Sequence, residues 1–178
     1  MITFLLGGAR SGKSTLAVEI GRRHAATGGD VVFVATAEAF DDDLRSRIAL
    51  HRLERPDWPT VDAPVALAAA ITDVPADALV IVDCLTVWLG NLFHHVSAAH
   101  ERADAQRSFV SALAHRSGPA VVVSNEVGLG LHPDTSMGRE YRDELGRLNQ
   151  RMAAAADRTL LLVAGRALPL ADPWEVLS

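Results

Sequence analysis

Near its start the chain reads Gly7-Gly8-Ala9-Arg10-Ser11-Gly12-Lys13-Ser14, which matches the pattern G-x-x-x-x-G-K-[ST]. An apolar run precedes this stretch and a segment of helical composition follows it. Glycines allow backbone N–H groups to point inward, the helix N-terminus adds partial positive charge, and the lysine reaches the β and γ phosphates of a nucleotide. Lys13 is the only lysine of the chain. A glycine-rich turn without function would not explain why the chain's single lysine lies at this position. The stretch therefore predicts a phosphate-binding loop with Ser14 as a magnesium ligand.

Apolar, β-branched runs alternate with helix-like segments along the chain. The runs lie at residues 2–6, 31–34, 79–82, 120–123 and 159–163. The helix-like segments lie at residues 14–26, 41–54, 65–71, 98–115 and 139–156. Strands that are apolar along their whole length and alternate with helices are typical of a parallel sheet covered by helices on both faces. We therefore expect one α/β domain over residues 1–178, with the mostly parallel sheet of a P-loop NTPase-type fold.

Length and composition narrow the class of protein. The 178 residues suit one domain, and 49% hydrophobic with 22% charged residues is ordinary for a folded chain. A net charge of -5 argues against binding to a nucleic-acid backbone. No apolar run reaches the length of a membrane span, and the single cysteine, Cys84, can form no internal disulfide. We expect a cytoplasmic protein with no nucleic-acid partner and no membrane span, in which oxygen ligands hold any metal.

A carboxylate ends the predicted strand at residues 79–82. Asp83 would lie at the carboxyl edge of the sheet beside the phosphate loop, where it is the expected second magnesium ligand, directly or through water. Many strands end in aspartate, so this interpretation depends on the phosphate loop. Cys84 is interpreted as a small buried hydrophobe, because no cationic cluster adjoins it to stabilise a thiolate.

His51 combines two conflicting signals. It falls on the apolar face of the predicted helix 41–54, as a packing residue would. Arg47, Arg52 and Arg55 lie around it, and such a cluster suits phosphate oxygens. Nearby cations also disfavour the imidazolium, and a neutral imidazole nitrogen is a nucleophile that can attack phosphorus. These residues alone leave both a packing role and a nucleophilic role open.

The predicted strand 120–123 runs into a polar, glycine-bearing loop. Asn125 and Glu126 follow the strand at the sheet edge where ligands of open α/β sheets bind, so they are candidates for orienting a γ phosphate, a water or a substrate hydroxyl. Asn and Gly also favour turns for backbone reasons alone. The sequence does not assign His132, later in the loop, either a functional or a structural role.

Several short motifs, taken in chain order, resemble one family. They are the phosphate loop, Ala35-Thr36-Ala37, Arg47-Ile48 with His51, Arg55-Pro56 with Trp58, Asp83-Cys84-Leu85-Thr86, Asn125-Glu126-Val127-Gly128, and Arg142-Asp143 with Asn149-Gln150. The family is the bifunctional adenosylcobinamide kinase and adenosylcobinamide-phosphate guanylyltransferase of cobalamin assembly. The motifs span nearly the whole chain, and together they are far more specific than a phosphate loop by itself.

The resemblance implies an enzyme with two steps. ATP or GTP would phosphorylate the aminopropanol hydroxyl of adenosylcobinamide, and GMP from a second GTP would then be transferred to adenosylcobinamide phosphate through a covalent GMP on His51. Pyrophosphate would be released and adenosylcobinamide-GDP formed. The resemblance further implies a homotrimer, Mg²⁺ bound with the nucleotide, and catalytic roles for Lys13 and His51. It maps nucleotide contacts onto Gly7, Gly8, Ala9, Arg10, Ser11, Gly12, Lys13, Ser14, Ala35, Thr36, Ala37, Arg52, Leu53, Glu54, Arg55, Asp62 and Asp83.

Two residues depart from the family's pattern. This chain has Asp62 where members commonly carry glutamate, which leaves its contact with a base or ribose open. It has Leu50 where a polar residue or histidine is common, so the implied nucleophile is His51 and not its neighbour.

Three other classes of nucleotide-binding protein share the phosphate loop. A signalling GTPase needs an Asn-Lys-x-Asp motif, which a chain whose only lysine is Lys13 cannot contain. A monofunctional small-molecule kinase differs from the bifunctional enzyme only at the His51 cluster, and covalent labelling by GTP distinguishes the two. A noncatalytic nucleotide sensor would release no pyrophosphate.

Overall fold

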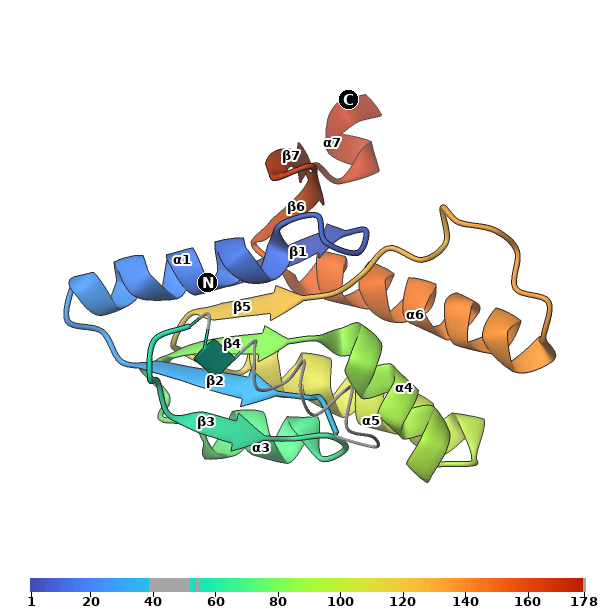
Figure 1. The fold of residues 1–178 in the computed structure, drawn as a ribbon, viewed down its shortest axis with the longest axis horizontal. Coiled ribbons are helices and arrows are strands. Elements are labelled where there is room, and N and C mark those ends of the chain that lie inside the picture. The colour runs from blue at the N-terminus through green and yellow to red at the C-terminus, as the bar shows by residue number, and fades with distance from the viewer. Residues whose placement is uncertain (39–51, 54, 178) are drawn as a thin grey trace.

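The computed structural model describes residues 1–38, 52, 53 and 55–177, and within them one sheet lies between two layers of helices (Figure 1). The strands of this sheet are β1 (Ile2–Gly7), β2 (Val31–Ala35), β3 (Thr60–Asp62), β4 (Leu79–Asp83), β5 (Ala120–Val123), β6 (Arg158–Val163) and β7 (Arg166–Leu170). The described helices are α1 (Lys13–Ala26), α3 (Leu67–Asp73), α4 (Leu85–His95), α5 (Ala99–Ala114), α6 (Ser136–Ala155) and α7 (Pro173–Leu177).

The strand order across the sheet is β3-β2-β4-β5-β1-β6-β7, and all neighbours pair in parallel except β6 and β7. β1 lies between β5 and β6, and β5 separates it from β4. The carboxyl ends of β1 and β4 therefore lie at the same edge of the sheet, with one strand between them. This confirms the predicted α/β fold with a mostly parallel sheet.

Successive residues of each central strand contribute to opposite faces of the sheet. Phe4, Val80 and Val122 pack in the cluster on the face that α3, α4, α5 and α6 cover. Leu5 and Ile81 pack in the cluster on the other face, which α1 covers. All five are at most 1% exposed, which explains why these strands are apolar at every position. Both faces being covered confirms the predicted layering.

Gly21 sets the close approach of α1 to the sheet. A Cβ atom at this position would lie 2.5 Å from the Trp58 ring and 2.9 Å from Ile81 Cδ1. Trp58 thus packs beneath α1 as part of the second cluster. A larger residue at Gly21 would push α1, and with it the phosphate loop at its start, away from the sheet.

The predicted element ends agree with the structure to within a few residues, and one difference has a visible cause. The helix predicted at 139–156 begins at Ser136 because Thr135 is its N-cap, whose Oγ1 accepts a hydrogen bond from the Gly138 backbone N–H at 3.0 Å. The prediction at 41–54 falls outside the described residues except for Arg52 and Leu53, which are helical.

Four elements were not among the predicted ones. β3 is only three residues long. α4 does carry apolar residues at a helical spacing, Leu85, Trp88, Leu89 and Leu92, a signal that the sequence analysis missed. β7 contains Pro169, which suits an edge strand, and α7 is a single short helix at the end of the described chain. Within the described residues, no helix combines the length and apolar character needed to cross a membrane.

Candidate phosphate-binding site

The loop between β1 and α1 has a backbone that glycine permits and larger residues would strain. Gly7 and Gly12 have φ angles of 153° and 101°, in the left-handed range. A Cβ atom on Gly7 would lie 2.3 Å from the Leu162 carbonyl oxygen, closer than atoms can approach. Arg10 is a non-glycine residue with a positive φ, 55°. The loop therefore curves tightly from the strand into the helix, as a phosphate-cradling loop must.

Lys13 is buried against this loop, with only 6% of its surface exposed. Its Nζ donates hydrogen bonds to the carbonyl oxygens of Gly7 at 3.0 Å and Gly8 at 2.6 Å, and to Ser11 Oγ at 3.3 Å. Burial lowers the pKa of Lys13, and the charge of nearby Asp83 opposes that shift. The ammonium group is thus held at the loop, beside a carboxylate, where a nucleotide's terminal phosphates would bring further negative charge.

The donor set at this edge fits a hard cation. Ser14 lies in the first turn of α1, and Asp83 ends β4. In the parts of the chain that the structure describes, no group of three or more His, Cys, Asp or Glu side chains could hold a metal ion by itself. A hydroxyl and one carboxylate suit Mg²⁺, which commonly takes few protein ligands and completes its shell with phosphate oxygens and water.

Thr36 clamps the end of β2 to the end of β4. Its fully buried hydroxyl donates to the Cys84 carbonyl oxygen at 2.9 Å and accepts from the Cys84 N–H at 2.8 Å. Asn91 of α4 donates to the Thr36 carbonyl oxygen at 2.7 Å. This network holds the residue after Asp83 and so positions the carboxylate, while nucleotide contacts by Ala35, Thr36 and Ala37 stay predictions. Burial raises the pKa of Cys84 to about 11, in keeping with an unreactive thiol.

The arginine segment, residues 52–62 apart from Glu54, leads into and includes β3, which pairs with β2. The Arg55 guanidinium stacks 3.8 Å from the ring centroid of Phe33, and its buried Nη1 has no hydrogen-bond partner among the described residues. Burial and the charge of Arg52 lower the pKa of Arg55, and Asp62 and Asp83 oppose this. Arg52 Nη2 pairs with Asp62 Oδ1 at 3.2 Å in an exposed ion pair. A buried cationic donor without a partner is a candidate anion contact. His51 and Glu54 lie outside the described residues.

The segment after β5 is tied to the phosphate loop. The Glu126 N–H donates to the Gly7 carbonyl oxygen at 3.1 Å, and the Asn125 N–H donates to Thr86 Oγ1 at 2.9 Å. Glu126 Oε1 accepts from the Gly128 N–H at 2.6 Å. The structure therefore brings the predicted substrate loop, Asn125 and Glu126, next to the phosphate loop, with the Glu126 carboxylate engaged in a local turn.

The turn between β6 and β7 supports the phosphate loop from the other side, which the sequence analysis missed. The Gly165 N–H donates to the Ser11 carbonyl oxygen at 2.9 Å, and the Gly165 Cα lies 3.4 Å from where a Cβ on Gly12 would be. Both Ala164 and Gly165 have positive φ angles, 50° and 72°. The short turn Ala164-Gly165 between two apolar runs was the available signal for this hairpin.

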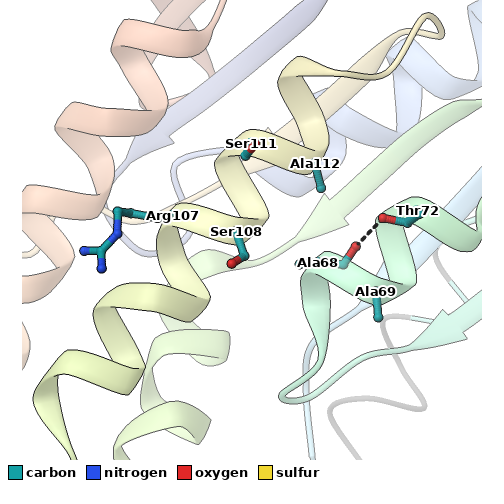
Figure 2. A pocket seen from close by; sticks show the side chains of 7 residues that line it. All are labelled: Ala68, Ala69, Thr72, Arg107, Ser108, Ser111 and Ala112. Carbon is teal, nitrogen blue, oxygen red and sulfur yellow. Dashed lines mark hydrogen bonds between the residues drawn. The ribbon is translucent and has the colours of Figure 1, made fainter.

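An open groove of about 530 Å³ lies elsewhere, between α3 and α5 (Figure 2). It is lined mainly by small side chains, namely Ala68, Ala69, Thr72, Arg107, Ser108, Ser111 and Ala112. These residues include no carboxylate, histidine or cysteine, and the groove is separate from the phosphate loop.

The fold and this loop define a P-loop nucleotide-binding α/β protein. Solved structures with the same fold include the flagellar accessory protein FlaH of Methanocaldococcus jannaschii, with a TM-score of 0.54, 13% identity, and coverage of 95% of this chain and 77% of that one. A prototypical ATPase from the type III secretion system of pathogenic bacteria has a TM-score of 0.56 at 14% identity, covering 91% of this chain and 51% of that one. At such low identity these likenesses concern the fold alone.

Residues 3–170 match the family model described as cobinamide kinase / cobinamide phosphate guanyltransferase, and the chain belongs to this family. The bifunctional adenosylcobalamin biosynthesis protein CobP of Pseudomonas aeruginosa is 41% identical over 173 residues, which cover 96% of this chain and 97% of the relative. The bifunctional protein CobU of Salmonella typhimurium is 37% identical over 183 residues, covering 93% and 97%. The family that the sequence motifs indicated is thereby confirmed.

Proposed function

We propose that this chain is an enzyme that phosphorylates adenosylcobinamide with ATP or GTP and then transfers GMP from GTP to the product, giving adenosylcobinamide-GDP and pyrophosphate. The supporting observation is that Lys13 is buried against a glycine-rich loop whose backbone suits phosphate binding. The chain also matches the bifunctional family over residues 3–170. We further propose that the whole chain is one catalytic domain, that it acts in the cytoplasm, and that it assembles as a homotrimer.

In the first step the acceptor hydroxyl oxygen attacks the γ phosphorus, and the bond from that phosphorus to the bridging oxygen breaks. The nucleoside diphosphate leaves, and the hydroxyl proton passes to the solvent. The loop N–H groups and the Lys13 ammonium bind the phosphates and stabilise charge that develops on their oxygens. Ser14 and Asp83 would hold a magnesium ion, which neutralises phosphate charge when bound. Thr36 and Asn91 keep β2 and β4 aligned, so that Asp83 stays in register with the loop.

In the second step a neutral His51 nitrogen attacks the α phosphorus of GTP, and the bond to pyrophosphate breaks. The phosphate of adenosylcobinamide phosphate then attacks the same phosphorus, and His51 leaves as the free imidazole. One difficult displacement becomes two easier ones. Arg52 and Arg55 would bind the phosphates of this nucleotide. In support, Arg55 stacks on Phe33 of β2 with its Nη1 buried, and Arg52 pairs with Asp62 of β3.

A monofunctional kinase is the second candidate, because it would need the same phosphate site without the histidine chemistry. GTP labelling separates the two. The protein incubated with GTP and Mg²⁺ should gain one GMP by mass, lost in mild acid and stable in alkali, as a phosphorus–nitrogen bond is. The adduct should map to the peptide that contains His51.

His51→Ala should abolish the adduct and guanylyl transfer while keeping much of the ATP-dependent phosphorylation of adenosylcobinamide. His24→Ala, in α1, is the matched control and should label like the wild type. An adduct that survives in His51→Ala, or that maps to His132, would overturn the assignment of the nucleophile. A wild-type protein that phosphorylates the corrinoid and never labels would be the monofunctional kinase.

A further inference from the structure

Two leucines in the connection from β5 to α6 lie almost wholly in solvent. Leu129 is 86% exposed and Leu131 is 96% exposed, and Met137, just inside α6, is 65% exposed. Single exposed apolar residues are common, whereas a contiguous exposed apolar patch marks an interaction surface, and three such residues within positions 129–137 are candidates for one. We call residues 127–137 the leucine loop.

Both ends of the leucine loop are anchored. At its start, the Glu126 side chain accepts the Gly128 N–H, and the Glu126 N–H is bonded to Gly7. At its end, Arg139 Nη1 donates to the carbonyl oxygens of Pro133 and Asp134, both at 3.0 Å. The leucines therefore lie between two fixed points, and their exposure follows from the course of an anchored backbone.

The leucine loop continues directly from the phosphate site. It arches beyond the carboxyl ends of the strands, at the edge where the phosphate loop lies (Figure 1). Its first residues follow Asn125 and Glu126, which are bonded to Thr86 and Gly7. An acceptor whose hydroxyl enters the phosphate site from this edge would bring the rest of its body against the leucine loop.

The chemistry of the loop suits a large amphipathic ligand. Residues 127–133 carry no carboxylate, lysine or arginine. At the margin, Arg142 Nη1 lies 2.7 Å from His132 Nδ1, and Arg142 Nη2 is paired with Asp143 at 3.0 Å. The loop thus offers an apolar contact with polar groups on one side.

We propose that the leucine loop is the docking surface for the corrin macrocycle of the acceptor. Leu129 and Leu131 pack on an apolar face of the ring, while His132 and Arg142 lie beside the amide groups at its rim. The inference rests on the proposed function, because that function makes a corrinoid the acceptor. It adds the binding surface, which lies outside the nucleotide site.

The test is a binding and kinetic comparison of Leu129→Ser/Leu131→Ser with the wild type. Equilibrium dialysis, followed by the visible absorbance of the corrinoid, gives the Kd for adenosylcobinamide without any turnover. We expect the Kd and the KM for adenosylcobinamide to rise about tenfold or more, because apolar contact area is lost. GMP labelling by GTP needs no corrinoid, so its rate should be unchanged.

Leu170→Ser is the control, since Leu170 is an exposed leucine at the far end of β7 and should leave the Kd unchanged. An unchanged Kd in the double variant would overturn the proposal, as would a changed sedimentation coefficient, which would make the loop a contact between protomers. A wild-type protein that labels with GMP and binds the corrinoid, beside an unaffected double variant, refutes only the docking surface. A wild-type protein that neither labels nor binds refutes the proposed function as well.

Discussion

The phosphate loop and the arginine segment both carry positive charge that we propose binds phosphate, but they are held in place differently. In the loop, Lys13 is 6% exposed and bonded to two carbonyl oxygens and a hydroxyl. In the arginine segment, Arg52 pairs with Asp62 where both side chains are more than half exposed, at 52% and 63%. Arg55 rests on the Phe33 ring.

The difference shows how each region selects its ligand. Backbone N–H groups and a lysine held by backbone carbonyls recognise phosphate geometry and nothing of the nucleoside. Long arginine side chains with a few side-chain partners can reach different parts of a ligand. We infer that the loop serves any nucleoside triphosphate, whereas the arginine segment serves the step in which GTP is the GMP donor. Single substitutions in the two regions should therefore separate the two activities.

The largest effect is expected at Lys13. In Lys13→Arg the planar guanidinium cannot replace a compact ammonium among the carbonyl oxygens of Gly7 and Gly8, so kinase kcat should fall about 100-fold or more. Arg23→Lys, in an exposed pair with Glu19 on the same helix, is the control and should keep full activity. Steady-state kinetics with ATP check both, and wild-type turnover in Lys13→Arg would contradict the role of the ammonium.

An intermediate, selective effect is expected at Arg55. Arg55→Gln removes the buried donor beside Phe33, so the rate of GMP labelling should fall about 20-fold while ATP-dependent kinase activity changes less than about fivefold. Rapid-quench measurement of the covalent adduct gives the first rate. Equal losses in both activities would show that the phosphate loop and the arginine segment do not serve separate steps.

The smallest effect, on stability, is expected when the exposed ion pair between Arg52 and Asp62 is removed. Asp62→Asn should lower the free energy of unfolding of the nucleotide-free protein by less than about 1 kcal/mol, because exposed pairs gain little over solvation by water. Urea unfolding of the variant and the wild type measures this. A loss well above that figure would mean that the pair organises the arginine segment.

Much of the fold was predictable because the central strands are buried on both faces. Val80 and Ile81, neighbours that contribute to opposite faces, are both fully buried. Burial on both faces requires apolar residues at every position, which a sequence displays directly. Strands at the edge of the sheet need not be buried on both faces, so they need not be apolar at every position. β7 is exposed along its whole length and contains Pro169, so its composition gives only a weak strand signal beside the turn at Ala164-Gly165.

The candidate site likewise combines residues that the sequence could indicate with contacts that it could not. Gly7, Gly12 and Lys13 could be assigned from sequence because strand, loop and helix are contiguous, and local sterics allow few residues at such φ angles. Asp83 could be assigned because parallel strands end at a common edge. Only the tertiary structure decided that Gly165 supports Ser11, that Thr36 clamps Cys84, and that Arg55 stacks on Phe33. These partners are far apart in the chain, and packing of separate elements, which no local pattern encodes, brings them together.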